Sequence, residues 1–395
     1  MKAACFLNHL GVVCALGPNQ QETAQRIFAG ESGVTMTERF SNGGVPLPLG
    51  VVTAELPSVA GYPIEMRSRN NQLALLAALQ LREAILSVID RYGPSRVAVV
   101  VGTSTSGIGE SEAAIREYLA CGRLPLGYSF GQQELGSLSK FLASTFGLRG
   151  PAFVHSSACT SGAKAMASAA RLLQSGIADA VLTGAVDSLS GFTVAGFAAL
   201  NLVSPDRCNP FSRNRTGINV GEAAALFLMT REPATVRLAG WGESSDGHHF
   251  SAPDPTGRGA RAAIEGALLR AGISSAAVEY INLHATGTQT NDEMEGSVVH
   301  ALFGEHVPVS GTKPLTGHTL GAAGALEAAV CWQTMQIENA SGCLPPHLWD
   351  AEGDPAIPAL HFVVPNETLG APPKVTLSTS FAFGGSNAAL IFVRE

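Results

Sequence analysis

The segment Arg96–Gly102, with the sequence RVAVVVG, constrains the fold of this chain most strongly. A continuous β-branched run is typical of a strand buried on both faces of a parallel sheet. A strand with one wet face would instead alternate apolar and polar residues. Such sheets carry helices on both faces, so the run predicts an α/β protein with a layered core.

Strand and helix patterns alternate along the rest of the chain. A short apolar run at 152–154 precedes a helix pattern at 163–174, and a further strand pattern at 180–183 ends at Gly184. We expect further strands at 223–229, 235–239, 278–284, 307–310, 375–380 and 388–393, and helices at 257–272 and 321–337. The last two strands should form a hairpin. Both halves run strand, helix, strand, which is a weak sign of duplication and favours domains at 1–232 and 233–395.

Composition narrows the class of protein. The chain has 395 residues, 46% hydrophobic and only 14% charged, and its net charge of −7 argues against general nucleic-acid binding. So few charges on a large chain also suggest a surface covered by another subunit. No apolar run reaches about 18 residues, so we expect no membrane span. The first ten residues lack a secretion signal, and seven irregularly spaced cysteines show no CxxC pair, which predicts a reduced cytoplasmic protein.

Cys159 lies in the stretch HSSACTSGA, between an expected strand and an expected helix. The helix dipole and the unpaired N–H groups of the first turn would favour a thiolate there, and they could also hold an oxyanion. A buried structural cysteine is the commoner fate of this residue type. The second half supplies possible partners: His284 at a strand end, Lys313 and His318 in one loop, and a glycine-rich turn at 380–387. Each alone has an ordinary structural explanation, but together they suggest acyl transfer.

Six ordered motifs make the chain resemble the β-ketoacyl-[acyl-carrier-protein] synthases of the condensing-enzyme, or thiolase-fold, superfamily. They are ACTSG (158–162), NPFSRNRTGINVGEAAA (209–225), SSDGHHFSAP (244–253), NLHATGTQTND (282–292), GTKPLTGHTLGAAGALEA (311–328) and SFAFGGSNA (380–388). The resemblance implies a thiolase-like layered α-β-α-β-α fold with two pseudo-duplicated halves. It also implies the decarboxylative condensation of an acyl chain with malonyl-carrier protein.

The resemblance implies a role for each matching residue. Cys159 would carry the acyl chain, with its backbone N–H and that of Phe383 as the oxyanion hole. His284 and His318 would promote loss of CO2, and Lys313 would orient His318. The remaining implied roles are a charge partner of Lys313 (Glu327), a phosphopantetheine site (Thr286, Thr288, Ser251) and an acyl pocket with its gate (Phe381, Phe383, Ile108). Residues 105–108 and 130–138 would line the pocket, the latter from this chain or from a partner subunit. No metal, nucleotide or redox cofactor is implied.

The resemblance also implies partners. An acyl carrier protein is acidic, so we expect a basic docking patch drawn from Arg67, Arg69, Arg207, Arg213 and Arg215. We also expect a homodimer, or a heterodimer with a related synthase or chain-length-factor subunit. The strand after the nucleophile helix would pair across the two-fold axis.

Several residues depart from the family pattern. Ala285 and Gln289 stand where a glycine and a proline are usual, Ala382 replaces a glycine beside the gate, and Lys164 replaces a histidine. The family serves fatty-acid biosynthesis or specialised pathways, and these departures favour a specialised synthase, in a pathway that builds polyene or polyketide chains, over the housekeeping enzyme of fatty-acid elongation. Other readings are a chain-length factor, which lacks the nucleophile, a thiolase, which has a second late cysteine, and a non-catalytic carrier-binding subunit.

Overall fold

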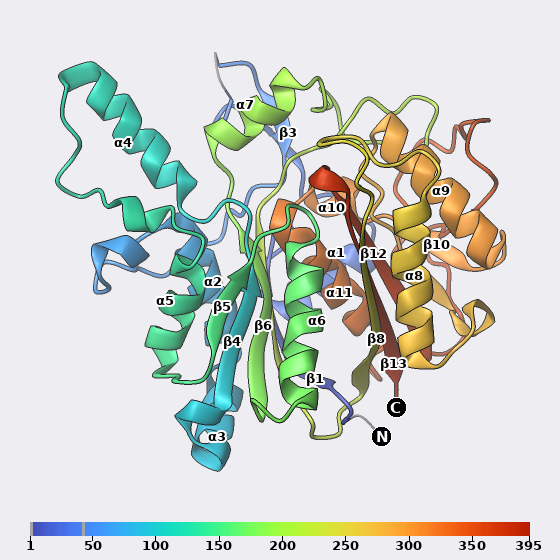
Figure 1. Cartoon of the computed structure of the whole chain (residues 1–395). Helices are drawn as coiled ribbons and strands as arrows, with labels where there is room; N and C mark the ends of the chain where they lie inside the picture. The colour runs from blue at the N-terminus through green and yellow to red at the C-terminus, as the bar shows by residue number, and fades with distance from the viewer. Residues whose placement is uncertain (1–2, 42–43) are drawn as a thin grey trace.

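The computed structural model describes residues 3–41 and 44–395 (Figure 1). Its strands are β1 (Phe6–Val13), β2 (Thr35–Thr37), β3 (Leu47–Leu49), β4 (Val97–Gly102), β5 (Ala152–His155), β6 (Ala180–Asp187), β7 (Ala223–Thr230), β8 (Val236–Ser245), β9 (Tyr280–Asn282), β10 (Pro308–Ser310), β11 (His361–Phe362), β12 (Val375–Ala382) and β13 (Ser386–Arg394). Its α-helices are α1 (Gln20–Phe28), α2 (Arg69–Leu79), α3 (Arg82–Tyr92), α4 (Ile108–Cys121), α5 (Ser137–Phe146), α6 (Ser161–Gln174), α7 (Gly191–Ala199), α8 (Arg258–Ala271), α9 (Gln289–Phe303), α10 (Lys313–Thr316) and α11 (Ala323–Thr334).

The strands form two halves with the same internal order. The first runs β1-β7-β6-β4-β5, and the second runs β8-β13-β12-β9-β10 with β11 added at its edge. In each half the first strand is followed across the sheet by the last, the next-to-last, the second and the third. The two halves join through β1 and β8, which pair only at Phe6 and Arg237. The predicted pair of pseudo-duplicated halves is therefore confirmed.

The helices complete the predicted five layers. Helices α2 and α5 cover the outer face of the first half, and α8 covers the outer face of the second. Between the halves lie α6 and α11, each of which contacts strands of both. Both central helices are rich in alanine and glycine, which lets them approach closely: a Cβ at Gly162 would lie 2.8 Å from the backbone nitrogen of Ala325. The buried valines of β4 pack in the core as expected.

Two strands, β8 and β6, extend furthest beyond their expected ends, and glycine is the reason in both. β8 continues to Ser245 because Gly240 and Gly242 sit under α8, where a Cβ at either would collide with backbone oxygens of that helix. β6 passes through Gly184, which adopts a φ of 126° against β7, and ends only at Asp187. The expected hairpin of the last two strands is confirmed, with Ala382 opposite Ser386.

One expectation about assembly is wrong. The strand after the nucleophile helix, β6, lies between β7 and β4, so neither of its edges is open to another subunit. The open edge of the first half belongs to β5, the strand before that helix, whose Phe153 is 38% exposed. Within the described residues, no single helix is long and apolar enough to cross a membrane, although the bent pair α2 and α3 together has the length and composition to do so.

Candidate active site

Cys159 lies in a tight turn between β5 and α6, as the sequence indicated. Ala158 adopts a φ of 50°, a left-handed conformation that turns the chain sharply before the helix. Ser161 holds this turn, since its hydroxyl accepts from Ser157 N–H at 2.9 Å and donates to the Ala158 carbonyl at 2.6 Å. The thiol is therefore presented at the N-terminal end of α6, where it is only 8% exposed.

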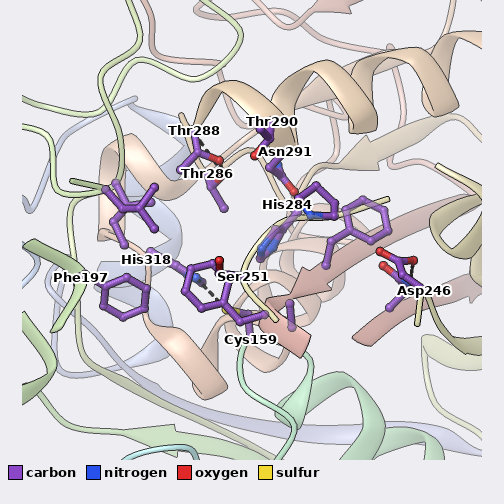
Figure 2. Close-up of a pocket in the computed structure, with 17 residues that line it drawn as sticks. Cys159, Phe197, Asp246, Ser251, His284, Thr286, Thr288, Thr290, Asn291 and His318 are labelled. Carbon is purple, nitrogen blue, oxygen red and sulfur yellow. Dashed lines mark hydrogen bonds between the residues drawn. The ribbon is translucent and has the colours of Figure 1, made fainter. Parts of the chain in front are cut away.

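Both predicted histidines face the thiol. His318 Nε2 lies 3.0 Å from Cys159 Sγ, and the rings of His318 and His284 meet edge to face with centroids 5.4 Å apart. One nitrogen or sulfur atom from each of the three residues lies within 4.8 Å of the others. Figure 2 shows these side chains converging on one space, although they come from distant parts of the chain.

Lys313 contacts His284 and not His318, so the expected orienting contact is wrong. Its ammonium lies 3.3 Å from His284 Nδ1 and donates to the His284 carbonyl and to Glu327. An ammonium has only donors, so Nδ1 of His284 must accept and its Nε2 must carry the proton. That N–H therefore points into the site. Lys313 and Glu327 are buried together, as the expected charge pair.

Burial dominates the electrostatics of this cluster. It raises the pKa of the Cys159 thiol to about 12, with Lys313 opposing the shift. Desolvation and the nearby Lys313 charge hold the pKa of both His284 and His318 well below the usual value. The histidines are therefore neutral at physiological pH and the resting thiol is protonated. Desolvation therefore opposes the thiolate that the helix N-terminus and the Lys313 charge favour.

Glu295 was not singled out from the sequence, yet it fixes the backbone that carries His284. Its carboxylate accepts from the N–H groups of His284 and Ala285, each at 2.7 Å, and from the hydroxyl of Thr379 at 2.8 Å. Burial raises the pKa of Glu295 to about 7. The sequence did offer a signal for this role. Glu295 lies one turn beyond Asn291, on the buried face of the helix that follows the histidine motif.

The unusual residues of the histidine loop fit without disrupting it. Ala285 adopts a φ of 45°, the left-handed region that favours glycine, and its Cβ occupies space left open because residue 311 is glycine. Gln289 is the first residue of α9, a position where proline is favoured but not required. The threonine hydroxyls on either side of Gly287, Thr286 and Thr288, lie 2.9 Å apart.

Two cavities meet at the thiol. The first, which we call the histidine cavity, is lined by both histidines, Phe381 and all the predicted phosphopantetheine residues, namely Ser251, Thr286 and Thr288 (Figure 2). The second, the phenylalanine cavity, is lined by Thr105, Ile108, Phe192, Phe197, Leu200 and Phe383. Cys159, Phe197 and Phe383 border both, and the two phenylalanine rings lie 5.7 Å apart.

The walls of the phenylalanine cavity differ partly from the expectation. Thr105 and Ile108 line it as predicted, but none of residues 130–138 does. Within this chain Leu138 is buried in a separate core cluster and Phe130 is 64% exposed, so that segment could reach a cavity only in a partner subunit. The aromatic residues of α7 were missed, because an apolar helix gives no sign of which cavity it borders.

The predicted basic patch separates into two groups. Arg69 is paired with the buried Glu222, and Arg215 is 3% exposed among Asp292, Glu293 and Asp354. Neither can dock a carrier, so the expectation for these two is wrong. Arg67, Arg207 and Arg213 are exposed, the last beside Glu352.

Comparison with known proteins agrees with this geometry. Residues 10–234 match the family model of the beta-ketoacyl synthase N-terminal domain, and residues 235–348 match that of its C-terminal domain. The chain is 32% identical to Nodulation protein E of Rhizobium sp. (strain N33) and 29% identical to 3-oxoacyl-[acyl-carrier-protein] synthase 2 of Coxiella burnetii, with 99–100% of this chain and 99% of each relative covered. One chain of the solved complex of a ketosynthase with its chain length factor from Xenorhabdus doucetiae superposes with a TM-score of 0.94 at 42% identity, over 100% of this chain and 98% of that one.

A thiolase-like fold with a cysteine and two histidines at its centre defines a condensing enzyme. With both domain models matched in order, the chain belongs to the β-ketoacyl synthase family.

Proposed function

We propose that this protein is a β-ketoacyl-[acyl-carrier-protein] synthase that lengthens an acyl chain held on Cys159. The observation that carries the proposal is the 3.0 Å contact between Cys159 Sγ and His318 Nε2, with His284 edge-on to His318, at the junction of two cavities. A nucleophile beside a base, with a second donor in reach, is the arrangement that acyl transfer requires. The same observation argues against a chain-length factor or a non-catalytic carrier-binding subunit.

The first half-reaction is transfer of the acyl chain. Cys159 sulfur attacks the carrier thioester carbonyl as its proton passes to His318 Nε2. The backbone N–H groups of Cys159 and Phe383 stabilise the oxyanion. The carbon–sulfur bond to phosphopantetheine then breaks, and the departing thiolate takes the proton. A protonated resting thiol with a neutral imidazole at hydrogen-bond distance suits this sequence, because deprotonation accompanies attack.

The second half-reaction is condensation. Once Cys159 is acylated, the His318 ring proton moves from Nδ1 to Nε2 by exchange with solvent, and the Nε2–H groups of His284 and His318 both donate to the malonyl thioester oxygen. The carbon–carbon bond to the carboxylate breaks, CO2 leaves, and the electron pair forms an enolate held by the two donors. The enolate carbon attacks the Cys159 thioester, the new carbon–carbon bond forms, and the cysteine leaves as a thiolate that takes one proton from solvent. The product is a β-ketoacyl carrier two carbons longer.

The proposed substrates need no resident cofactor. Both acyl groups arrive on the phosphopantetheine arm of an acyl carrier protein, and the hydroxyls of Thr286, Thr288 and Ser251 in the histidine cavity would hydrogen-bond that arm. Loss of CO2 drives condensation without metal, nucleotide or redox chemistry. We propose Arg67, Arg207 and Arg213 as the remaining docking candidates for the acidic carrier. All seven cysteines are free thiols, which fits a reducing compartment such as the cytoplasm.

The proposed assembly is a dimer through the open edge of β5. An open strand edge of this kind can pair with a strand of another chain. Helix α4 also projects from the body of the molecule (Figure 1), and Leu119 on this helix and Leu126 just after it are exposed. The partner would be a second copy or a chain-length factor, since the solved relative belongs to a complex of a ketosynthase with its chain length factor. We place the enzyme in a specialised pathway that builds polyene or polyketide chains, on the basis of its departures from the family pattern.

The test is mass spectrometry of Cys159 after incubation with a panel of acyl-carrier thioesters. Wild type should gain the acyl mass at Cys159 and release a β-ketoacyl carrier when malonyl-carrier is added. Prior alkylation with iodoacetamide should block both. No adduct at Cys159 with any acyl carrier, alone or with the partner subunit, would refute the proposal and favour a non-catalytic role.

A further inference from the structure

Lys164 lies one turn into the nucleophile helix, and its side chain reaches the gate. The residue is half-buried on α6, five positions after Cys159. Its ammonium donates to the Ser386 hydroxyl at 2.6 Å. Burial lowers the pKa of Lys164, with the Glu243 carboxylate opposing the shift. A lysine ammonium that is partly desolvated and donates a short hydrogen bond to a neutral serine is unusual. The position of that serine indicates which part of the structure Lys164 stabilises.

Ser386 is the first link in a chain of hydroxyl groups that reaches the nucleophile turn. Its oxygen lies 2.9 Å from the Thr160 hydroxyl, which in turn donates to the Ser157 carbonyl at 2.8 Å. The ammonium can only donate, so Ser386 must accept from Lys164 and pass its own proton toward Thr160. All three hydrogen bonds therefore run in one direction, from Lys164 to the backbone beside Cys159. Bonds aligned in this way strengthen one another, and the first is charge-assisted.

Ser386 directly follows the turn that carries Phe383. Gly384 and Gly385 in this turn have φ values of 79° and 70°. On its other side the turn is held by backbone bonds, from Gly384 N–H to the Phe250 carbonyl and from Asp246 N–H to the Gly385 carbonyl. The hydroxyl chain ties the end of the turn to α6, so a side chain on the nucleophile helix determines how far the turn can move.

We propose that Lys164 is a positioning residue for the gate. Through Ser386 it holds the turn at 383–385 in the conformation that places Phe383 between the histidine and phenylalanine cavities, and so it tunes which acyl chains pass. This inference rests on the proposed synthase function and adds the residue that sets its acyl selectivity. Lys164 does not line either cavity, so it acts through the turn and not by contact with substrate.

The experiment compares Lys164→Met, Ser386→Ala and the double variant with wild type. Losing a charge-assisted hydrogen bond should raise the amide exchange rate of Gly384 and Gly385 about tenfold. It should also shift the ratio of kcat/KM for long and short acyl carriers by about the same factor, toward long chains. Because Lys164 acts through Ser386, the double variant should match the single variants and not their sum. Lys164→Arg keeps the positive charge and should leave the ratio of kcat/KM for long and short acyl carriers at the wild-type value.

Two controls separate this role from others. Lys374→Met removes an exposed lysine that precedes β12 and should change neither readout. The pH dependence of Cys159 alkylation should be the same in Lys164→Met and wild type, since the lysine acts on the turn and not on the thiol. If wild type forms the acyl adduct but Lys164→Met keeps its exchange rates and chain-length ratio, the inference fails while the synthase function stands. Strictly additive effects in the double variant would also overturn it.

Discussion

Arg69→Met should destabilise the fold and leave carrier docking intact. The guanidinium makes two hydrogen bonds to Glu222, at 2.9 and 2.5 Å, and a third to the Val52 carbonyl at 3.0 Å. Glu222 is fully buried, and its carboxylate also accepts from the Val52 and Leu189 N–H groups, each at 3.0 Å. Methionine fills similar space but leaves that carboxylate without its counter-charge.

The cost follows from this burial. Removing one partner of a buried, hydrogen-bonded ion pair destabilises a protein by about 3–5 kcal/mol, because the other charge remains desolvated. For a chain of 395 residues, the unfolding entropy is roughly 0.8 kcal/mol/K, so the melting temperature should fall by roughly 4–6 °C. Differential scanning calorimetry at fixed protein concentration measures the shift. Steady-state kinetics on the folded enzyme should show an unchanged KM for the acyl carrier.

Arg207 supplies the matched control, because it is an exposed arginine from the same predicted patch. Arg207→Met should change stability by no more than about 0.5 kcal/mol. Arg207→Glu should raise KM for the carrier substrate but not for a pantetheine thioester that lacks the protein. An Arg69→Met enzyme as stable as wild type, with a raised carrier KM, would show that Arg69 docks the carrier and that the burial argument is wrong.

Cys159→Ala should abolish acylation and condensation, because the thiol is the nucleophile, while malonyl decarboxylation persists. CO2 release measures decarboxylation and the product mass measures condensation. Condensation by this variant would show that Cys159 is not the nucleophile. His284→Ala and His318→Ala should each slow decarboxylation by about 10²–10³-fold through loss of one enolate donor, and full CO2 release by both would contradict the two-donor model. Ala382 adopts an ordinary extended conformation with a φ of −127°, so Ala382→Gly should fold normally yet loosen selectivity between short and long acyl carriers by adding a hinge beside Phe383. An unchanged chain-length profile would show that the hinge position does not limit the gate.

The sequence identified most of the fold because its signals were local. The valine run of β4 indicates a strand, and the alanine-rich patterns of α6 and α11 indicate helices. Neither inference needs any information about distant residues. The position of Cys159 at a strand–helix junction, and of His284 beyond a strand, likewise followed from patterns a few residues long. Cys159 follows β5 in the first half and the histidines follow β9 and β10 in the second, and the packing of the two halves around α6 and α11 brings them together.

Contacts between loops could not be read in the same way. Lys313 and His318 are neighbours in sequence, so the lysine was expected to orient that histidine. The short helix α10 instead directs Lys313 toward His284, a loop from another strand. The glycines of β8 looked like a strand end, since the helix that requires them lies later in the chain. Arg69 resembled a surface charge because Glu222, its partner, is 153 residues away.

The protonation state of Cys159 decides how the thiol is activated, and alkylation kinetics can measure it. Burial raises the pKa of this thiol to about 12, although the N-terminal end of α6 and the Lys313 ammonium favour the charged form. Only thiolate reacts with iodoacetamide, so below the pKa the rate should rise about tenfold per pH unit. We expect that rise to continue through pH 9 without a plateau. Lys313→Met should lower the rate at every pH, because the variant loses the charge that favours thiolate. A plateau below pH 8 in the wild type would mean that the helix N-terminus outweighs desolvation, and acyl transfer would then begin from a preformed thiolate with no need for His318 as the base.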